Sequence, residues 1–507
     1  MLHSQSLSLP AVISPSLGVV IGLLIAIPLG ILIAQGNGTV GLAVVLAAWL
    51  YCFIGFRWQR GFYGLLLYLP FAGVVILALY PWKAALLFKD FFFLVPAYIG
   101  FFARLAVGQE SLADLPRLPV GLMITLSLLA LVGLATVGNG NFQMGLIGLK
   151  VWLLYLPLFA LAFASVVTER DLLLLLRLLM APAFVPAALG IVEAILANVG
   201  GYQSVMESFY GAVAPQTTQG FAQFSVGEGM LARIPSTFPF VTQYFGYTLA
   251  MLPICYALGR GAPFSWWRSL GRGMLVVLAI ASFLSGARAA FVFTPLLLML
   301  MFAFERGLSG FVPSGTYVIG PLFTALAILG IGSVALYRHI SALFVSYAGD
   351  VAYGGLAEAL HLTFWGVGTG TGTGAARYAF TDPNSFRTIE NYYAKAVYEL
   401  GLPGLVVVVG IFTSIIWLGF LSHRRLRSPL LRSTSAGLLA FFVTMALNSF
   451  KGWQIDLDPI NVYFWVFAGI LMKLPLLDRS VISPAQPACL LQLPPPQRQG
   501  GQEGVCV

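Results

Sequence analysis

Five arginines stand in or beside the long polar stretches that separate the apolar segments of this chain: Arg233, Arg288, Arg338, Arg377 and Arg387. A guanidinium group stays charged when it is partly buried and binds phosphate oxygens through a planar, bidentate fork. The pattern therefore favours an anionic ligand, most strongly at Arg288, which lies between two apolar segments. The alternative, in which these side chains extend to lipid headgroups, stays open, above all for Arg377 and Arg387.

A carboxylate, Glu390, precedes an apolar segment of which one helical face carries Asn391, Lys395 and Glu399. At the mouth of a polar cavity, such a carboxylate can accept the proton of an attacking hydroxyl group. The alternative role of Glu390 is to stabilise the start of a helix, and Glu399 could simply pair with Lys395.

One histidine, His361, ends a short amphipathic stretch within residues 356–364. We expect it to pack at the membrane interface, with a role as a base as the alternative. The sequence has no His, Cys and carboxylate cluster with the spacing of a metal site, so neither a metal nor another cofactor is predicted.

Residues 366–374 alternate glycine with valine and threonine, and Gly368 and Gly370 lie at their centre. The segment lacks the Gly-Lys-Ser/Thr ending of a phosphate-binding P-loop. Its backbone amides could form a nest for diphosphate oxygens. Composition favours a flexible turn that returns the chain to the membrane.

The elements that must position these residues are membrane helices. The chain has 507 residues, of which 59% are hydrophobic and 9% charged, and this excludes a soluble globular protein. Apolar segments long enough to span a bilayer recur about 14 times. Uninterrupted apolar runs such as residues 122–137 exclude the alternating pattern of a β-barrel. We therefore predict an all-α, polytopic integral membrane protein.

The predicted spans are residues 17–34, 39–56, 62–80, 84–102, 118–137, 150–167, 172–199, 236–258, 273–287, 289–304, 316–337, 392–420, 435–450 and 459–474. Two outer loops exceed the length of a linker, at 200–235 and 338–391. Residues 1–474 form one integral membrane domain, and the Pro- and Gln-rich residues 475–507 form a disordered tail.

The basic residues predict the orientation. With the N-terminus inside, the clusters around residues 57–60, 104–117, 260–272 and 424–432 all fall on the cytoplasmic side. The net charge of +9 therefore reflects topology, and no nucleic-acid partner is predicted. Both termini are expected in the cytoplasm, with the two long loops outside.

Residues 273–304 are apolar apart from Arg288 and could form one long span or two short ones. One span would leave Arg288 near the bilayer centre and would move the cluster at 424–432 to the outside. Two short segments that meet at residues 285–288 avoid both problems. We therefore predict two short segments with a break at residues 285–288.

Four stretches together resemble the O-antigen ligase and polymerase family of bacterial envelope polysaccharide assembly. They are Arg233-Ile234-Pro235-Ser236-Thr237-Phe238, Leu284-Ser285-Gly286-Ala287-Arg288-Ala289-Ala290, Gly366-Val367-Gly368-Thr369-Gly370, and Glu390-Asn391-Tyr392-Tyr393 followed by Tyr398-Glu399-Leu400-Gly401-Leu402-Pro403-Gly404. Their order matches the family over roughly residues 230–420, and the first 200 residues match only as a series of spans.

The resemblance implies a GT-C-like helical fold in the bacterial inner membrane and an inverting, metal-independent glycosyl transfer at its outer face. The donor would be a polyprenyl-diphosphate-linked oligosaccharide and the acceptor a hydroxyl group of a glycan or lipid. Arg233 and Arg288 would hold the diphosphate leaving group. The substrate would be bound by these residues: Arg338, Arg377, Arg387, Gly368, Gly370, Asn391, Tyr392 and His361.

The sequence departs from the family at one position. The family has histidine before the asparagine that opens the late span, whereas this chain has Glu390. Either Glu390 acts as the base, or His361 does. Glu390 at this position favours a polymerase or another relative over a ligase.

Two other functions compete with glycosyl transfer. A secondary transporter, like relatives linked to bicarbonate uptake, would use ionisable residues within spans, such as Lys89, Asp90 and Glu193. A flippase for lipid-linked sugar would also bind diphosphate through arginine. Neither needs a long outer loop, and Lys89 and Asp90 could neutralise each other.

Overall fold

The computed structural model describes residues 48, 51–55, 57–79, 83–110, 112, 142–211, 223–226, 229–330, 341, 347–373 and 389–482. Within them the regular elements are helices and one antiparallel hairpin, in which β1 (Gln223–Val226) pairs with β2 (Gly229–Ala232). The hairpin lies inside the predicted loop 200–235. A helical membrane protein is confirmed.

The helices of the first half are α3 (Trp58–Tyr68), α4 (Ala72–Ala78), α5 (Val95–Ala106), α7 (Phe142–Leu153), α8 (Leu158–Ser165), α9 (Glu169–Gly200) and α10 (Tyr202–Tyr210). Those of the second half are α12 (Val241–Gly261), α13 (Ser265–Leu284), α14 (Ala290–Arg306), α15 (Phe311–Leu329), α17 (Gly355–Leu362), α19 (Tyr392–His423), α20 (Pro429–Asn448) and α21 (Ile460–Ile482). Segments of 3-10 or π-helix are η1 (Leu69–Phe71), η2 (Lys83–Leu87), η3 (Asp90–Leu94), η6 (Gly307–Gly310), η7 (Tyr347–Gly354) and η9 (Gln454–Asp456).

Nine helical stretches among the described residues are long and apolar enough to cross a membrane. They are Trp58–Ala78, Ala85–Ala106, Phe142–Ser165, Glu169–Gly200, Ser265–Leu284, Val312–Leu329, Tyr392–His423, Pro429–Asn448 and Ile460–Asp478. The predicted spans 236–258 and 289–304 also overlap helices, α12 and α14. The predicted spans 17–34 and 118–137 lie outside the described residues, and so does most of 39–56. Of the predicted tail 475–507, residues 475–482 belong to the α21 helix, and the rest lies outside the described residues.

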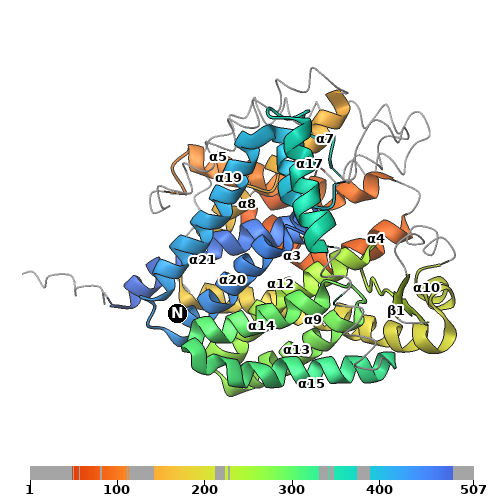
Figure 1. Cartoon of the computed structure of the whole chain (residues 1–507). Helices are drawn as coiled ribbons and strands as arrows, with labels where there is room; N and C mark the ends of the chain where they lie inside the picture. The colour runs from red at the N-terminus through yellow and green to blue at the C-terminus, as the bar shows by residue number, and fades with distance from the viewer. Residues whose placement is uncertain are drawn as a thin grey trace, which may run out of the picture.

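The α12 helix forms the centre of the bundle and is buried along nearly its whole length. Small residues allow its neighbours to approach, as expected where lipid removes the hydrophobic drive for helix association. Gly259 of α12 faces Gly271 of α13, and Gly261 faces Leu430 of α20 so closely that a Cβ atom there would overlap that helix. Figure 1 shows α13, α14 and α15 side by side below α12, with α19 and α17 together on the other side.

The predicted break within residues 273–304 is confirmed, since α13 ends at Leu284 and α14 begins at Ala290. Gly286 adopts a φ of 71°, which favours glycine. The Ser285 hydroxyl accepts a hydrogen bond from the Ala287 amide (3.2 Å) and donates one to the Ser282 carbonyl (2.6 Å). Arg288 therefore lies in a short, internally bonded turn between two helices.

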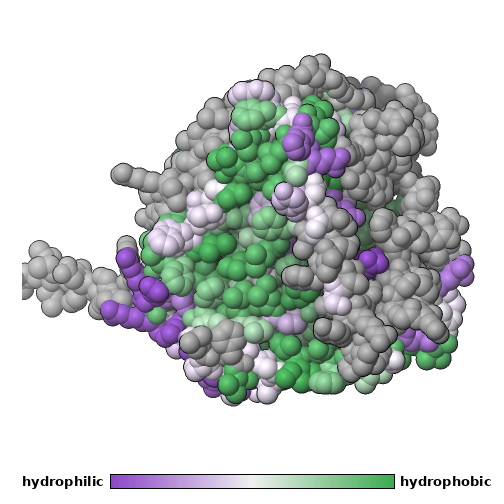
Figure 2. All heavy atoms as spheres, in the orientation of Figure 1, coloured by the Kyte–Doolittle hydropathy of each residue, from purple (hydrophilic) through white to green (hydrophobic). Residues whose placement is uncertain are grey.

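One end of the bundle gathers many arginines of the described residues. Arg260 Nε lies 3.2 Å from Glu305 Oε2, where α12 and α14 end. The Asp478 carboxylate of α21 accepts hydrogen bonds from the amides of Arg427 and Ser428 before α20 (3.3 and 3.2 Å). Further basic residues of the helices that begin or end here are Arg170, Arg268, Arg306, Arg424, Arg425 and Arg432. We call this the arginine-rich end. Figure 2 shows hydrophilic residues at this end and a hydrophobic surface over the middle of the same face.

Candidate functional site

Two backbone hydrogen bonds join four separate segments at the other end of the same helices. The Ile234 amide donates to the Ser285 carbonyl (3.0 Å), which brings the segment before α12 against the turn that carries Arg288. The Tyr392 amide donates to the Ser449 carbonyl (2.9 Å), which brings the start of α19 against the residues after α20. Residues far apart in the sequence therefore meet where these helices begin and end.

Four charged side chains gather here: Arg233, Arg288, Glu390 and Lys451. The pKa of Lys451 is lowered from its ordinary 10.5 to about 8. Burial is the largest cause, the positive charges of Arg233 and Arg288 also lower this pKa, and the Glu390 carboxylate partly offsets them. Coulombic effects of this kind act between groups that are close in space. We call these four residues the cationic cluster.

The cationic cluster contains three positive groups and one negative group in a partly desolvated setting. Arg233, Arg288 and Lys451 are partly buried, whereas Glu390 is exposed. The Nε atom of Arg288 is buried and has no hydrogen-bond partner among the described residues. Clustered cations in a partly buried place repel one another, so this arrangement favours an anionic ligand that would neutralise them.

Hydrogen bonds of Ser236 and Thr237 fix the segment that carries Arg233 against neighbouring helices. Ser236 has a φ of 52°, its amide donates to Glu193 Oε2 (3.1 Å), and its hydroxyl donates to the Pro186 carbonyl (2.7 Å). The Thr237 hydroxyl donates to the Pro70 carbonyl (2.5 Å). These bonds to α9 and η1 give the buried Glu193 carboxylate a structural partner and hold Arg233 in place.

Asn391, and not Glu390, caps the start of α19. The Asn391 side chain caps the helix, because its Oδ1 accepts from the amides of Tyr393 (2.9 Å) and Ala394 (3.1 Å). Its Nδ2 donates to the Ala352 carbonyl (3.1 Å). Asn391 thus performs the capping that was the alternative role of Glu390, and the Glu390 side chain projects from the residue before the cap.

Further along α19, Lys395 and Glu399 form a buried network. Their Nζ and Oε2 atoms lie 3.9 Å apart, as the alternative for Glu399 expected, and Lys395 also pairs with Asp456. The Trp152 Nε1 atom donates to Glu399 Oε2 (2.6 Å). The aromatic ring of the buried Tyr392 lies 5.5 Å from the ring of Trp152. This network holds α7, α19 and η9 together below the cationic cluster.

The glycine-rich segment is a turn wedged between α7 and α19. The Gly368 amide donates to the Glu399 carbonyl (3.2 Å), and the Gly372 amide donates to Glu399 Oε1 (2.9 Å). At Gly370 the φ is 89°, and a Cβ atom would overlap the Met144 carbonyl oxygen. Close packing and backbone conformation therefore account for Gly368 and Gly370, and the Gly368 amide is already used within the protein.

We expect Gly370→Ala to lower the stability of the folded protein by about 2 kcal/mol or more, because the added methyl group meets backbone and the φ is unfavourable for alanine. Thermal unfolding of the purified protein in detergent measures this. Gly410→Ala is the matched control, since no atom lies within 4 Å of a Cβ atom there and the position is helical. Equal melting temperatures for the two variants would contradict the packing role of the turn.

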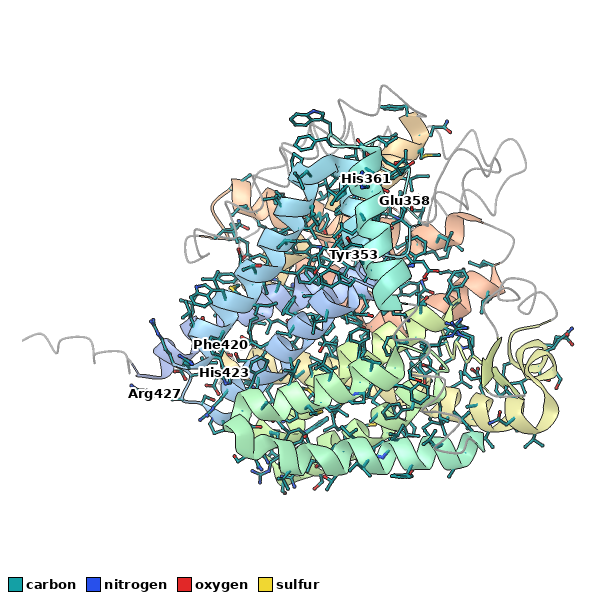
Figure 3. All side chains as sticks on the ribbon, viewed as in Figure 1. Tyr353, Glu358, His361, Phe420, His423 and Arg427 are labelled. Carbon is teal, nitrogen blue, oxygen red and sulfur yellow. The ribbon has the colours of Figure 1, made fainter. Side chains whose placement is uncertain are left out.

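His361 lies on α17 with an exposed side chain, near Glu358 and Tyr353 and far from His423 and Arg427 (Figure 3). The α17 helix packs on the start of α19 through Ala359. Arg338, Arg377 and Arg387, which were also predicted to bind substrate, lie outside the described residues.

Sequence reasoning missed Lys451. It stands in Phe450-Lys451-Gly452-Trp453 between the last two predicted spans, on the side where the other basic residues are sparse. A lone lysine in a short outer loop was the available signal, but a single residue without a motif carries little weight by itself. Lys451 becomes a candidate site residue only because the fold brings Arg233 and Arg288 close to it. Both arginines are more than 150 residues away along the chain.

A second buried charged group joins the first half of the chain to the segment before α21. Lys89 Nζ lies 2.6 Å from Asp90 Oδ1 and 3.2 Å from Asp458 Oδ1, and Lys150 Nζ lies 2.6 Å from Asp90 Oδ2. Tyr155 donates a hydrogen bond to Asp90 (3.0 Å). Two cations and two carboxylates thus neutralise one another, as was considered for Lys89 and Asp90.

No protein-family model matches this chain, and no curated protein matches it significantly. The resemblance to O-antigen ligases and polymerases therefore stays a prediction that rests on the four motifs. Three charged residues of these motifs, Arg233, Arg288 and Glu390, lie close enough to Lys451 to shift its pKa.

Proposed function

We propose that this protein is an inverting glycosyltransferase of the bacterial inner membrane that moves a glycan from a polyprenyl diphosphate to an acceptor hydroxyl group. The observation that carries the proposal is the convergence of Arg233, Arg288 and Lys451 beside the Glu390 carboxylate. The polyprenyl chain would lie in the membrane, and the acceptor would be a glycan or lipid, as in polysaccharide polymerases and ligases.

The position of the cationic cluster supports an outer active site. The helices α12, α13, α14, α19 and α20 begin or end at the cluster on one side and at the arginine-rich end on the other. Short cytoplasmic loops accumulate Lys and Arg, so the arginine-rich end is the expected cytoplasmic side. The cationic cluster would then face the side on which lipid-linked glycans are polymerised or transferred.

In the proposed reaction, the acceptor oxygen attacks the anomeric carbon from the face opposite the diphosphate. The bond between the anomeric carbon and the diphosphate oxygen breaks, and its electron pair stays on the diphosphate. Arg233, Arg288 and Lys451 stabilise the charge that develops there, and fixed donors act most strongly in the transition state. Glu390 accepts the proton of the acceptor hydroxyl group. Because the diphosphate already is the leaving group, the proposal needs no nucleotide or metal.

Transport is less well supported by the charged residues within the spans. Lys89 and Asp90 pair with each other, and Glu193 accepts a hydrogen bond from the Ser236 amide. A flippase would also use the arginines of the cationic cluster. It would move a lipid without making a glycosidic bond, and this difference separates the two functions by experiment.

The experiment reconstitutes the purified protein in liposomes with lipid-linked oligosaccharide extracted from the native membranes. We expect a longer or transferred glycan and released polyprenyl diphosphate, detected by gel electrophoresis and mass spectrometry. Movement of lipid or solute across the bilayer with no new glycosidic bond would contradict the proposal and favour a flippase or a transporter.

The pKa of Lys451 predicts how the reaction depends on pH. Because that pKa is lowered to about 8, Lys451 loses its proton and its charge as the pH rises through this value, and kcat/KM for the lipid-linked donor should then fall by up to about tenfold per pH unit. Steady-state rates between pH 6 and about 9.5 measure this. In Lys451→Arg the guanidinium stays charged, so the fall should disappear. An unchanged fall in that variant would exclude Lys451 as its source.

A further inference from the structure

Directly below the cationic cluster, five buried side chains of α12, α20 and α21 have polar atoms without hydrogen-bond partners among the described residues. We call them the polar seam. They are Gln243, Tyr247, Thr444, Asn448 and Tyr463, each at most 9% exposed. The unpartnered atoms are Gln243 Oε1, the hydroxyl oxygens of Tyr247, Thr444 and Tyr463, and both side-chain polar atoms of Asn448.

The packing of α12 against α20 shows that these residues share one level of the bundle. The helices run antiparallel, because the Ser433 hydroxyl donates to the Ala257 carbonyl (3.2 Å) and Gly437 packs against Pro253. Continuing this register places Tyr247 level with Thr444.

The same register places Gln243 level with Asn448, one turn nearer the cationic cluster. The Tyr463 ring lies 6.2 Å from the ring of Tyr247, which adds α21 to the seam. Asn448 ends α20, and its carbonyl accepts from the Lys451 amide (3.0 Å). The polar seam therefore begins one turn from the cluster.

Buried polar groups are almost always hydrogen-bonded, since each one left without a partner costs about 1–3 kcal/mol. A whole layer of them between three helices is therefore costly in the state described here. At the other end of the same helix pair Gly261 allows Leu430 to approach closely, and Ser435 is the one described α20 side chain there with an unpartnered buried polar atom. This contrast favours a seam that opens at the end near the cluster and closes against the opposite end.

We propose that the polar seam opens to bind the hydroxyl groups of the saccharide next to the diphosphate, which deepens and rests on the proposed function. Its groups are neutral and include hydroxyls and amides that both donate and accept hydrogen bonds, which matches the hydroxyl groups of a sugar. Two tyrosine rings provide flat apolar walls beside them. The cationic cluster one turn away takes the diphosphate, so the seam lies where the attached sugar would be.

The test uses variants that keep side-chain size and remove the polar atoms, Thr444→Val and Asn448→Leu. Binding to the reconstituted full-length protein is measured with two probes, lipid-linked oligosaccharide from the native membranes and polyprenyl diphosphate without sugar. We expect each variant to bind the sugar-bearing probe about tenfold more weakly and the sugar-free probe as the unchanged protein does. The melting temperature should rise, because buried polar atoms without partners have been removed.

The outcomes separate this inference from the function on which it rests. A higher melting temperature with unchanged affinity for the sugar-bearing probe would overturn the saccharide site and leave the cationic cluster intact. Equal weakening for both probes would also overturn it, since the seam would then act on the diphosphate. If the unchanged protein bound neither probe, the proposed function itself would fail. Tyr247→Phe and Tyr463→Phe repeat the test if either first variant does not fold.

Discussion

Arg288→Ala should lower the turnover of lipid-linked donor by about 10²–10³-fold, which is the effect of removing one fixed donor from a developing anion. Arg288 lies in the turn between α13 and α14, beside Arg233 and Lys451, and is the arginine for which the sequence alone predicted function most strongly. Its buried Nε atom has no hydrogen-bond partner among the described residues. Truncation therefore removes no described bond of that atom, and the variant should fold and insert normally.

Two further variants show whether charge alone is sufficient. Arg288→Lys keeps the charge but loses the bidentate fork, and we expect an intermediate loss of about tenfold. Arg306→Ala is the matched control, because Arg306 ends the same α14 helix at the arginine-rich end and is exposed. Turnover by Arg288→Ala that stayed within about threefold of the unchanged protein would exclude Arg288 from the leaving-group site.

Glu390→Gln should lower turnover by about 10²–10⁴-fold while donor affinity changes little, because an amide cannot accept the proton of the attacking hydroxyl group. Donor affinity should persist since Arg233, Arg288 and Lys451 are unchanged. The measurement compares single-turnover rates with equilibrium binding of the lipid-linked donor. Glu358→Gln, on the exposed side of the nearby α17, is the matched control.

The alternative base, His361, is tested in the same assay. If Glu390 is the base, His361→Asn should retain nearly full turnover. A loss of turnover in His361→Asn but not in Glu390→Gln would show that His361, on α17, accepts the proton. A second signature belongs to Glu390 alone. Its carboxylate raises the pKa of Lys451, so in Glu390→Gln the fall in kcat/KM at high pH should be centred below pH 8. A fall at unchanged pH would show that the two groups are not coupled.

Local patterns in the sequence were sufficient for the class of protein and for several of its elements. The apolar segments predicted the membrane helices, since a bilayer requires about 20 apolar residues for each helical span. The position of Arg288 within an apolar region predicted the break between α13 and α14, because a charge at the bilayer centre is costly. The pairing of Lys395 with Glu399 followed from their spacing on one helical face.

Other residues acquired a different meaning once their surroundings were known. Asn391 was predicted to bind substrate, and its side chain caps α19 and bonds to Ala352. Gly370 belongs to a segment that resembles a phosphate nest, and its lack of a side chain is required by the nearby Met144 carbonyl. The cap is a local contact within the start of α19, whereas the bond to Ala352 and the approach of Met144 to Gly370 join distant segments that no motif spacing reveals.

The sequence by itself determined that this chain is a helical membrane protein and drew attention to Arg233, Arg288 and Glu390, because hydropathy and charge are properties of the residues themselves. Only the tertiary structure decided that these three stand beside Lys451 and above the polar seam. That arrangement depends on the antiparallel packing of α12 and α20, whose small residues fix which levels of the two helices meet. Such packing brings together side chains some 200 residues apart in the chain. Local sequence patterns do not predict which levels of two such distant helices meet.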